Sequence, residues 1–165
     1  MIKKTSIQKR GLKAQKNGSE AEEIIIQLAK KYKRAGKAEI CKRYEPYKRI
    51  SKGRGIFKAT YTYKAGCDFE IWLNDGRAGH LELKTRKADR IAKNAIDTAQ
   101  EAQLQRRVSF MQLALILVRL QEDWYLVHFA RWYEGERKSH NAKQLAEIGV
   151  KVELRNNLPD FLDYI

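Results

Sequence analysis

The sequence predicts an α/β fold in which helices flank a mixed central sheet and a basic hairpin projects from the domain. Three observations favour this fold class. Apolar residues recur at helical spacing in residues 18–36, alternate with the period of a strand in residues 68–84, and form the strongest apolar run of the chain in residues 110–120. A chain of 165 residues is long enough for one domain with a substantial core. We therefore expect a single domain over residues 18–165, preceded by a separate segment over residues 1–17.

The positive charge is concentrated in the first two-fifths of the chain. The formal net charge is +14, and residues 1–64 contain 19 Lys and Arg against 5 Asp and Glu. Residues 65–165 contain 15 of each sign and are neutral. Such segregation indicates a surface that binds a polyanion, and nucleic acid is the usual one. A membrane surface is disfavoured because no segment combines a wide apolar face with the basic face.

Residues 1–17 are basic and have too little apolar content to pack against a core. They contain six Lys and Arg and no acidic residue. This composition predicts a flexible basic arm, which either contacts phosphates or serves only as a solubilising tail.

A helix is expected from Gly18-Ser19 to about Gly36. Its core-facing row consists of Ala21, Ile25, Leu28 and Tyr32. Ser19 is suited to the N-cap, and Glu22 three residues later completes a capping-box pattern. Glu22 therefore has two interpretations, a helix cap and an acidic metal ligand, and the residues alone favour the cap.

A basic hairpin is predicted at about residues 44–63, after a short strand at residues 39–44. Residues 42–64 contain eight Lys and Arg and one acidic residue, interleaved with five aromatic residues and a Gly-rich turn. Aromatic rings beside cations can stack on bases and pair with phosphates, although a charged flexible loop is the alternative. The candidate DNA-binding residues are Lys42, Arg43, Lys48, Arg49, Lys52, Arg54, Lys58 and Lys64, together with Arg86.

A second hairpin, residues 66–86, carries the candidate active site. Period-2 alternation places Asp68 on one face of the first strand and Glu82 and Lys84 on the same face of the returning strand. Two carboxylates on neighbouring strands can hold a hard divalent cation, and a lysine beside them can stabilise charge on a phosphate or position a water. An exposed sheet face with ordinary Glu and Lys pairs is the alternative.

The rest of the chain predicts scaffold elements. We expect a helix at residues 89–107, which carries Gln100, Gln103 and Gln105, and a doubly covered strand at residues 110–120. Further along, the pattern predicts a strand at residues 124–129, a helix at 141–147, an edge strand at 150–154 and a helical turn opened by Pro159. His128 is more typical of a packed or surface histidine than of a ligand.

No segment is expected to direct the chain into or across a membrane. Residues 1–16 lack the apolar core of a signal peptide, and no apolar run approaches membrane-spanning length. Cys41 and Cys67 form no CxxC motif or Cys/His cluster, so we expect two reduced thiols and neither a disulfide framework nor a zinc site. A soluble, intracellular protein is the expectation.

These motifs, taken in order, resemble those of a nuclease family. Gly18-Ser19-Glu20-Ala21-Glu22 opens the helix, and Asp68 precedes Glu82-Leu83-Lys84 by the spacing of the PD-(D/E)xK motif, with Cys67 at the proline position. The pattern is similar to that of Holliday junction resolvases of the archaeal Hjc and bacterial RecU types over most of residues 16–130. Residues 131–165 match no part of either type.

The resemblance implies a restriction-endonuclease-like core and a role for each motif. Glu22, Asp68, Glu82 and Lys84 would be catalytic, and Glu22, Asp68, Glu82 and the backbone carbonyl of Leu83 would bind one or two Mg2+ ions, for which Mn2+ could substitute. Ser19, Gln103 and Gln105 would support the site, with Gln103 or Gln105 as the glutamine that follows the lysine in the RecU type. The basic hairpin would correspond to the RecU stalk.

The implied function is resolution of four-way (Holliday) DNA junctions by paired symmetric nicks. This would serve DNA recombination and repair, and it implies a homodimer acting in a bacterial or phage-infected host cytoplasm. Two alternatives remain open. One is another PD-(D/E)xK endonuclease that cuts duplex or other branched DNA, and the other is a non-catalytic DNA-binding protein.

Overall fold

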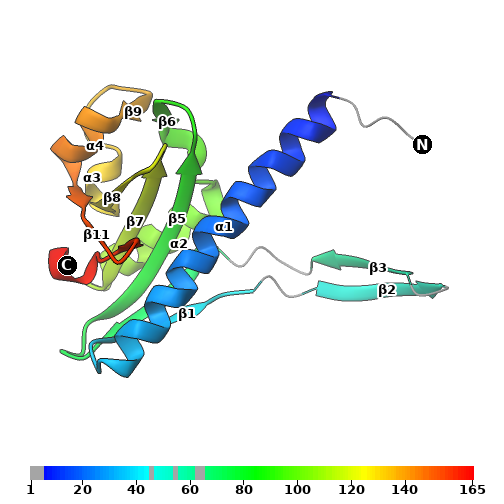
Figure 1. Ribbon diagram of the computed structural model, residues 1–165, viewed down its shortest axis with the longest axis horizontal. Helices are drawn as coiled ribbons and strands as arrows, with labels where there is room; N and C mark the ends of the chain where they lie inside the picture. Colours follow the sequence, from blue (N-terminus) through cyan, green and yellow to red (C-terminus); the bar gives the residue numbers. More distant parts are fainter. Residues whose placement is uncertain (1–5, 45–46, 54–55, 62–65) are drawn as a thin grey trace.

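A six-stranded mixed sheet forms the centre of the protein in the computed structural model (Figure 1), which describes residues 6–44, 47–53, 56–61 and 66–165. The strand order is β1-β4-β5-β7-β8-β10. These strands are β1 (Ala38–Lys42), β4 (Phe69–Leu73), β5 (Ala78–Arg86), β7 (Leu113–Leu120), β8 (Asp123–His128) and β10 (Val150–Val152). Only the β5–β7 pair is parallel, and the other pairs are antiparallel. The predicted mixed α/β fold is confirmed.

Helices cover both faces of this sheet. Helix α1 (Ser6–Arg34) covers one face, and its row of Ala21, Ile25, Leu28 and Tyr32 is buried as predicted. Helices α2 (Thr98–Ser109), α3 (Phe129–Trp132) and α4 (Ala142–Ile148) contribute to the second apolar cluster. Strand β7 contributes side chains to both clusters, so the doubly covered strand expected from its apolar run is confirmed.

The first helix begins much earlier than the sequence suggested. Helix α1 begins at Ser6, so Ser19 lies inside the helix and the predicted helix start at Ser19 is wrong. Residues 6–17 also belong to the helix rather than to an arm ahead of it. Good helix formers such as Lys, Gln, Leu and Ala outnumber the single glycine of this segment, Gly11, and a glycine in a helix costs only about 1 kcal/mol. The capping interpretation of Glu22 is therefore wrong as well.

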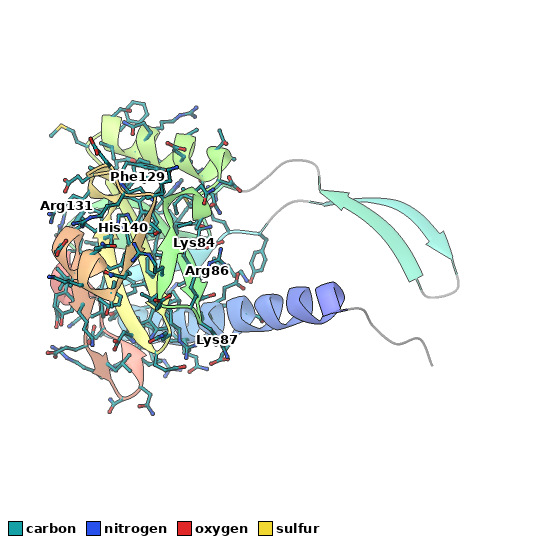
Figure 2. The ribbon with its side chains drawn as sticks, turned by 90° about the horizontal axis from the view of Figure 1, so that it is seen from above. Lys84, Arg86, Lys87, Phe129, Arg131 and His140 are labelled. Atoms are coloured by element: carbon teal, nitrogen blue, oxygen red, sulfur yellow. The ribbon has the colours of Figure 1, made fainter. Side chains whose placement is uncertain are left out.

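The basic hairpin is a separate two-stranded ribbon. Strands β2 (Tyr47–Gly53) and β3 (Ile56–Tyr61) are antiparallel, pair only with each other among the described strands, and contain an irregularity between Arg49 and Ser51. In Figures 1 and 2 the ribbon projects from the body on the same side as the N-terminal half of α1. The predicted projecting hairpin is confirmed, whereas Arg54 and Lys64 lie outside the described residues.

The segment before α2 is not an α-helix, so the helix predicted for residues 89–107 is confirmed only from Thr98 onward. It forms strand β6 (Arg90–Ala92) and a 3-10 turn, η1 (Lys93–Ala95), and α2 begins only at Thr98. Ile91 is buried and pairs with His140 of strand β9 (Ser139–Asn141). A partner almost fifty residues further along the chain therefore overrides the local helical pattern.

The C-terminal region completes the domain beyond β8. The predicted helix at 141–147 and edge strand near residue 150 are confirmed as α4 and β10, and His128 is exposed at the end of β8. Pro159 belongs to the short strand β12 (Leu158–Pro159), paired with β11 (Leu154–Arg155), and the final turn is η2 (Leu162–Tyr164). No helix within the described ranges has the length and apolar character needed to cross a membrane.

Candidate active site

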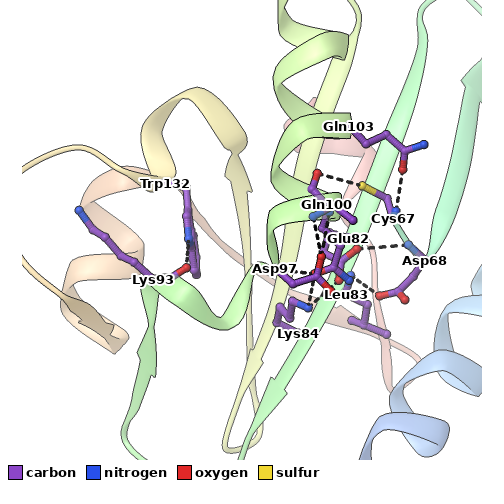
Figure 3. Close-up of polar contacts among 11 residues, drawn as sticks. Cys67, Asp68, Glu82, Leu83, Lys84, Lys93, Asp97, Gln100, Gln103 and Trp132 are labelled. Atoms are coloured by element: carbon purple, nitrogen blue, oxygen red, sulfur yellow. Dashed lines mark hydrogen bonds and ion pairs between the residues drawn. The ribbon is translucent and has the colours of Figure 1, made fainter. Parts of the chain in front are cut away.

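Asp68, which directly precedes β4, lies beside Glu82 of β5. Phe69 of β4 pairs with Leu81 of β5, so the next position on each strand brings the two acidic residues together. The amide of Asp68 donates to Glu82 Oε2 over 3.2 Å, and the amide of Leu83 donates to Asp68 Oδ2 over 2.9 Å (Figure 3). Each carboxylate is thus held by the backbone of the strand opposite it.

Lys84 completes the cluster, as the alternation of β5 predicts. Its Nζ lies 2.7 Å from Glu82 Oε1 and donates to Gln100 Oε1 over 2.9 Å (Figure 3). Glu82 is fully buried. Among the described residues, the Lys84 ammonium is the polar group that contacts its Oε1, and the contact is an ion pair. The structure brings the three residues together, while their catalytic roles stay predictions.

Burial makes the two carboxylates difficult to ionise together. Burial raises the pKa of the Glu82 carboxyl to about 8, and the negative charge of Asp68 adds to this rise while Lys84 opposes it. The pKa of Asp68 is raised mainly by burial and also by the charge of Glu22, against the hydrogen bond from Leu83. The ammonium of Lys84 balances only one of the two negative charges that Asp68 and Glu82 carry when both are ionised. A further cation would therefore stabilise the doubly ionised pair.

The donor set of the pair fits a hard divalent cation. Asp68 and Glu82 supply carboxylate oxygens, the ligands that Mg2+ prefers, and among the described residues the buried Oε1 of Glu82 has no polar partner beyond its contact with the Lys84 ammonium. The third predicted ligand is not with them. Across the residues that the structure describes, no three His, Cys, Asp or Glu side chains are grouped so as to hold a metal ion.

Glu22 lies on α1, where it pairs with a lysine of β1. Its Oε2 lies 2.6 Å from Lys42 Nζ, and both side chains are only partly exposed. Lys42 is the last residue of β1, at the root of the basic hairpin. The predicted metal ligand is thus close enough to influence Asp68 electrostatically, but a cation of the chain already neutralises it.

Gln100 is the glutamine that contacts the lysine, in place of Gln103 or Gln105. Asp97 caps α2 in a capping box with Gln100, whose Oε1 accepts both the Asp97 amide and the ammonium of Lys84. The spacing Asp97-x-x-Gln100 is a cap signature that could have located this helix start from the sequence. Gln105 is exposed, and Ser19 is exposed within α1.

Gln103 supports the chain just before Asp68. Its Oε1 accepts the amide of Cys67 over 2.7 Å, and Cys67 is buried. Gly66 has φ +79°, and a Cβ at this position would collide with Gln103 Oε1. The backbone that delivers Asp68 to the site therefore depends on a glycine at position 66.

Substituting Gly66 by Ala is expected to reduce the free energy of unfolding by about 1–3 kcal/mol, because the left-handed backbone and the side-chain collision add. Urea denaturation measures this reduction. Gly76→Ala is the matched control, since Gly76 has φ +89° with no atom near its would-be Cβ. Equal reductions in the two variants would mean that the contact with Gln103 contributes nothing.

Of the remaining DNA-binding candidates that the structure describes, Arg43 and Arg86 lie on the body of the protein and the others on the projecting ribbon. The Arg43 amide donates to the Asp68 carbonyl over 2.8 Å, and the Arg43 guanidinium pairs with Glu70. Arg86 is exposed at the end of β5, and Figure 2 shows it beyond Lys84 on that strand. The strands of the projecting ribbon carry Lys48, Arg49, Lys52 and Lys58. Contact of all these residues with DNA stays a prediction.

A buried histidine on the same face was not singled out from the sequence. His80 Nε2 lies 2.8 Å from Arg107 Nη2 of α2 and 3.7 Å from Glu70 Oε1. Burial lowers the pKa of His80 to about 4, and the charges of Arg107 and Arg43 lower it further, so the ring is neutral at pH 7. It ties α2 to the strand that carries Glu82 and Lys84.

Comparisons with known proteins show a structural likeness but no match by sequence family. No family model and no curated protein matches the chain. Among solved structures, it is similar to Hjc of Archaeoglobus fulgidus, a Holliday junction resolvase from an archaeal hyperthermophile, with a TM-score of 0.48 and 14% identity. The alignment covers 79% of this chain and 94% of that chain. The case for a function rests on the carboxylates, the lysine and the basic hairpin of the chain itself.

Proposed function

We propose that this protein is a metal-dependent endonuclease that cuts branched DNA, with the four-way (Holliday) junction as its preferred substrate. The observation that carries the proposal is the cluster of Asp68, Glu82 and Lys84, in which a partly buried carboxylate just before β4 meets a buried carboxylate and an ammonium on β5. The chain that leads to the basic ribbon β2–β3 leaves the sheet beside this cluster, since the Arg43 amide donates to the Asp68 carbonyl. A carboxylate pair that needs a cation, next to a basic projection, suits hydrolysis of a polyanion.

Each residue of the cluster has a distinct task in this proposal. Asp68 and Glu82 would hold Mg2+, or Mn2+ in its place, with the Leu83 carbonyl and Glu22 as further oxygen donors. Such an ion, when held by these residues, would supply Lewis acidity that lowers the pKa of a water and neutralises charge on the phosphodiester. Lys84 orients a water towards phosphorus and balances the negative charge that develops there, and Gln100 fixes the direction of its ammonium.

The preference for a junction is proposed from the ribbon and from symmetry. A projecting basic ribbon can insert between the arms of a branched DNA and contact phosphates there. A linear duplex has no branch point, so it would contact mainly the basic residues around the site. Two symmetric cuts require two sites, so a homodimer with two-fold symmetry is part of the proposal.

Cleavage assays separate this proposal from its alternatives. Labelled four-way junction and linear duplex of matched sequence are incubated with the protein, with and without Mg2+. We expect Mg2+-dependent cuts at symmetric positions of the junction and much slower cleavage of duplex. Equal cleavage of both substrates would favour a general duplex endonuclease, and binding without cleavage at any metal concentration would favour a non-catalytic DNA-binding protein.

Neutralising the ribbon is expected to weaken junction binding more than duplex binding. The variant replaces Arg49, Lys52, Arg54 and Lys58 by Gln, so that these four side chains can no longer pair with phosphates. The slope of log Kd against log salt should become shallower by roughly 0.9 for each phosphate that the variant no longer neutralises. Titrations at several salt concentrations measure this slope for both DNAs.

A matched control removes the same charge from the far end of α1. Lys30, Lys31, Lys33 and Arg34 are exposed there, away from the ribbon in Figure 1. Replacing these four by Gln should change junction and duplex binding alike and by less. If both variants weaken binding of both DNAs to the same extent, the ribbon does not recognise a branch.

A further inference from the structure

The Lys42–Glu22 ion pair occupies a carboxylate that the proposed metal site lacks. Lys42 Nζ lies 2.6 Å from Glu22 Oε2, with side-chain exposures of 24% for the lysine and 30% for the glutamate. The ammonium also lies 5.4 Å from the centroid of the Tyr44 ring. Glu22 is thus held on the α1 side of the sheet, while Asp68 and Glu82 contact each other's strands and Glu82 contacts Lys84.

Glu22 is nevertheless near the site. Its ion-pair partner Lys42 lies opposite Phe69 in the β1–β4 pairing, and Phe69 directly follows Asp68, although the three acidic residues form no ligand group among the described residues. Lys42 is the cation that neutralises Glu22 in the structure. Release of the Glu22 side chain from Lys42 would therefore add a negative charge that is free to attract a metal ion.

Lys42 is placed to exchange this carboxylate for a phosphate. It ends β1 at the root of the basic ribbon, and a lysine has a flexible stem and a strongly hydrated ammonium with three donors. A partly exposed ion pair contributes little stability, so a DNA phosphate nearby can compete for the ammonium.

We propose that Lys42 is a positioning residue that withholds Glu22 from the metal until DNA binds, an arrangement that we call the Lys42 latch. The inference rests on the proposed nuclease function and adds to it a coupling between DNA binding and metal binding. In the free protein Lys42 pairs with Glu22, and Asp68 and Glu82 alone offer carboxylates to the ion. When a phosphate takes the ammonium, Glu22 becomes a third donor. By linkage, metal and DNA must then raise each other's affinity by the same factor.

A double-mutant cycle in the absence of DNA tests the competition. Mn2+ binding is measured by calorimetry and by the electron paramagnetic resonance signal of the free ion for the wild type, Lys42→Met, Glu22→Gln and the double variant. We expect Lys42→Met to bind Mn2+ about threefold to fivefold more tightly than the wild type, as removal of a partly exposed ion pair allows. In the Glu22→Gln background the same change should have no effect, and Lys42→Arg should restore wild-type affinity.

The cycle separates the Lys42 latch from simple electrostatics. Removing any nearby positive charge favours cation binding, but that effect persists when Glu22 is neutral. If Lys42→Met tightens Mn2+ binding equally in both backgrounds, Lys42 does not act through Glu22. Unfolding temperatures of the four proteins, expected to agree closely because the pair is partly exposed, exclude a folding defect as the cause.

Coupling to DNA gives the second measurement. Ca2+ affinity of the wild type should rise when four-way junction is present, and the rise should be smaller in Lys42→Met, in which Glu22 is already released. Cleavage by the wild type with Mg2+ separates a failure of the Lys42 latch from a failure of the proposed nuclease function. Normal junction cleavage with no coupling in the cycle would overturn the Lys42 latch and leave the nuclease, whereas absence of both metal binding and cleavage would overturn both.

Discussion

Glu82→Gln is expected to abolish junction cleavage while the junction stays bound. A neutral amide keeps the shape of the side chain but cannot supply the charge that a hard cation requires, so single-turnover cleavage should fall by roughly 10³-fold or more, the scale of removing a central electrostatic stabiliser. Binding should be unchanged or slightly tighter, because a negative charge near DNA has been removed. Gel-shift titration without metal measures binding, and a quenched time course with Mg2+ measures cleavage.

Glu70→Gln is the matched control for this experiment. Glu70 is two residues from Asp68 along the chain, pairs with Arg43 and lies 3.7 Å from the His80 ring, and it does not belong to the carboxylate pair. It should retain most of the activity. Cleavage by Glu82→Gln within tenfold of the wild-type rate, or equal inactivity of both variants, would contradict a role for the buried carboxylate in holding the ion.

The metal-free protein should lose stability as the pH rises from about 4.5 to above 8. Burial raises the pKa of Glu82 from its ordinary value of 4.5 to about 8, so the folded state binds more protons than the unfolded state between these values. The stabilisation is complete below the unfolded pKa and is lost as the pH passes through the folded pKa, by at most about 5 kcal/mol. Urea denaturation in EDTA at a series of pH values measures this decline.

Two comparisons isolate Glu82 as its source. Glu82→Gln removes the titrating group, so this part of the decline should disappear, and Mg2+ should stabilise the wild type increasingly as the pH rises, because the ion favours the ionised carboxylate. A wild type and a Glu82→Gln variant with parallel pH profiles would show that the ionisation of Glu82 is not linked to folding.

The active-site cluster could be predicted because it depends on short-range geometry. The hairpin turn brings β4 and β5 together, and period-2 alternation decides which side chains share a face. Asp68, Glu82 and Lys84 follow from these two rules without knowledge of the rest of the fold. The buried row of α1 follows in the same way from helical spacing.

The errors arose where a local pattern was overruled by its surroundings. Ser19 and Glu22 have capping-box spacing, but helix formers on both sides allow α1 to continue through them. Residues 90–92 form a strand because Ile91 pairs with His140, a contact that no local pattern contains. The pairing of Lys42 with Glu22 likewise requires α1 to pack beside β1. Gln100 differs from these, since its capping box was visible in the sequence.

The ribbon joins the body as an insertion that could be shortened, lengthened or replaced. The chain leaves the sheet after Lys42 and returns at Asp68, and the bond from the Arg43 amide to the Asp68 carbonyl shows that these two points are adjacent. A short turn could therefore close the gap, and loop-closure entropy grows only slowly with the length of what is inserted. Because strands β2 and β3 pair with no strand of the described sheet, their length and charge are free to change across generations without disturbing the core. Under the proposed function, selection could thus alter how the ribbon binds DNA independently of Asp68, Glu82 and Lys84.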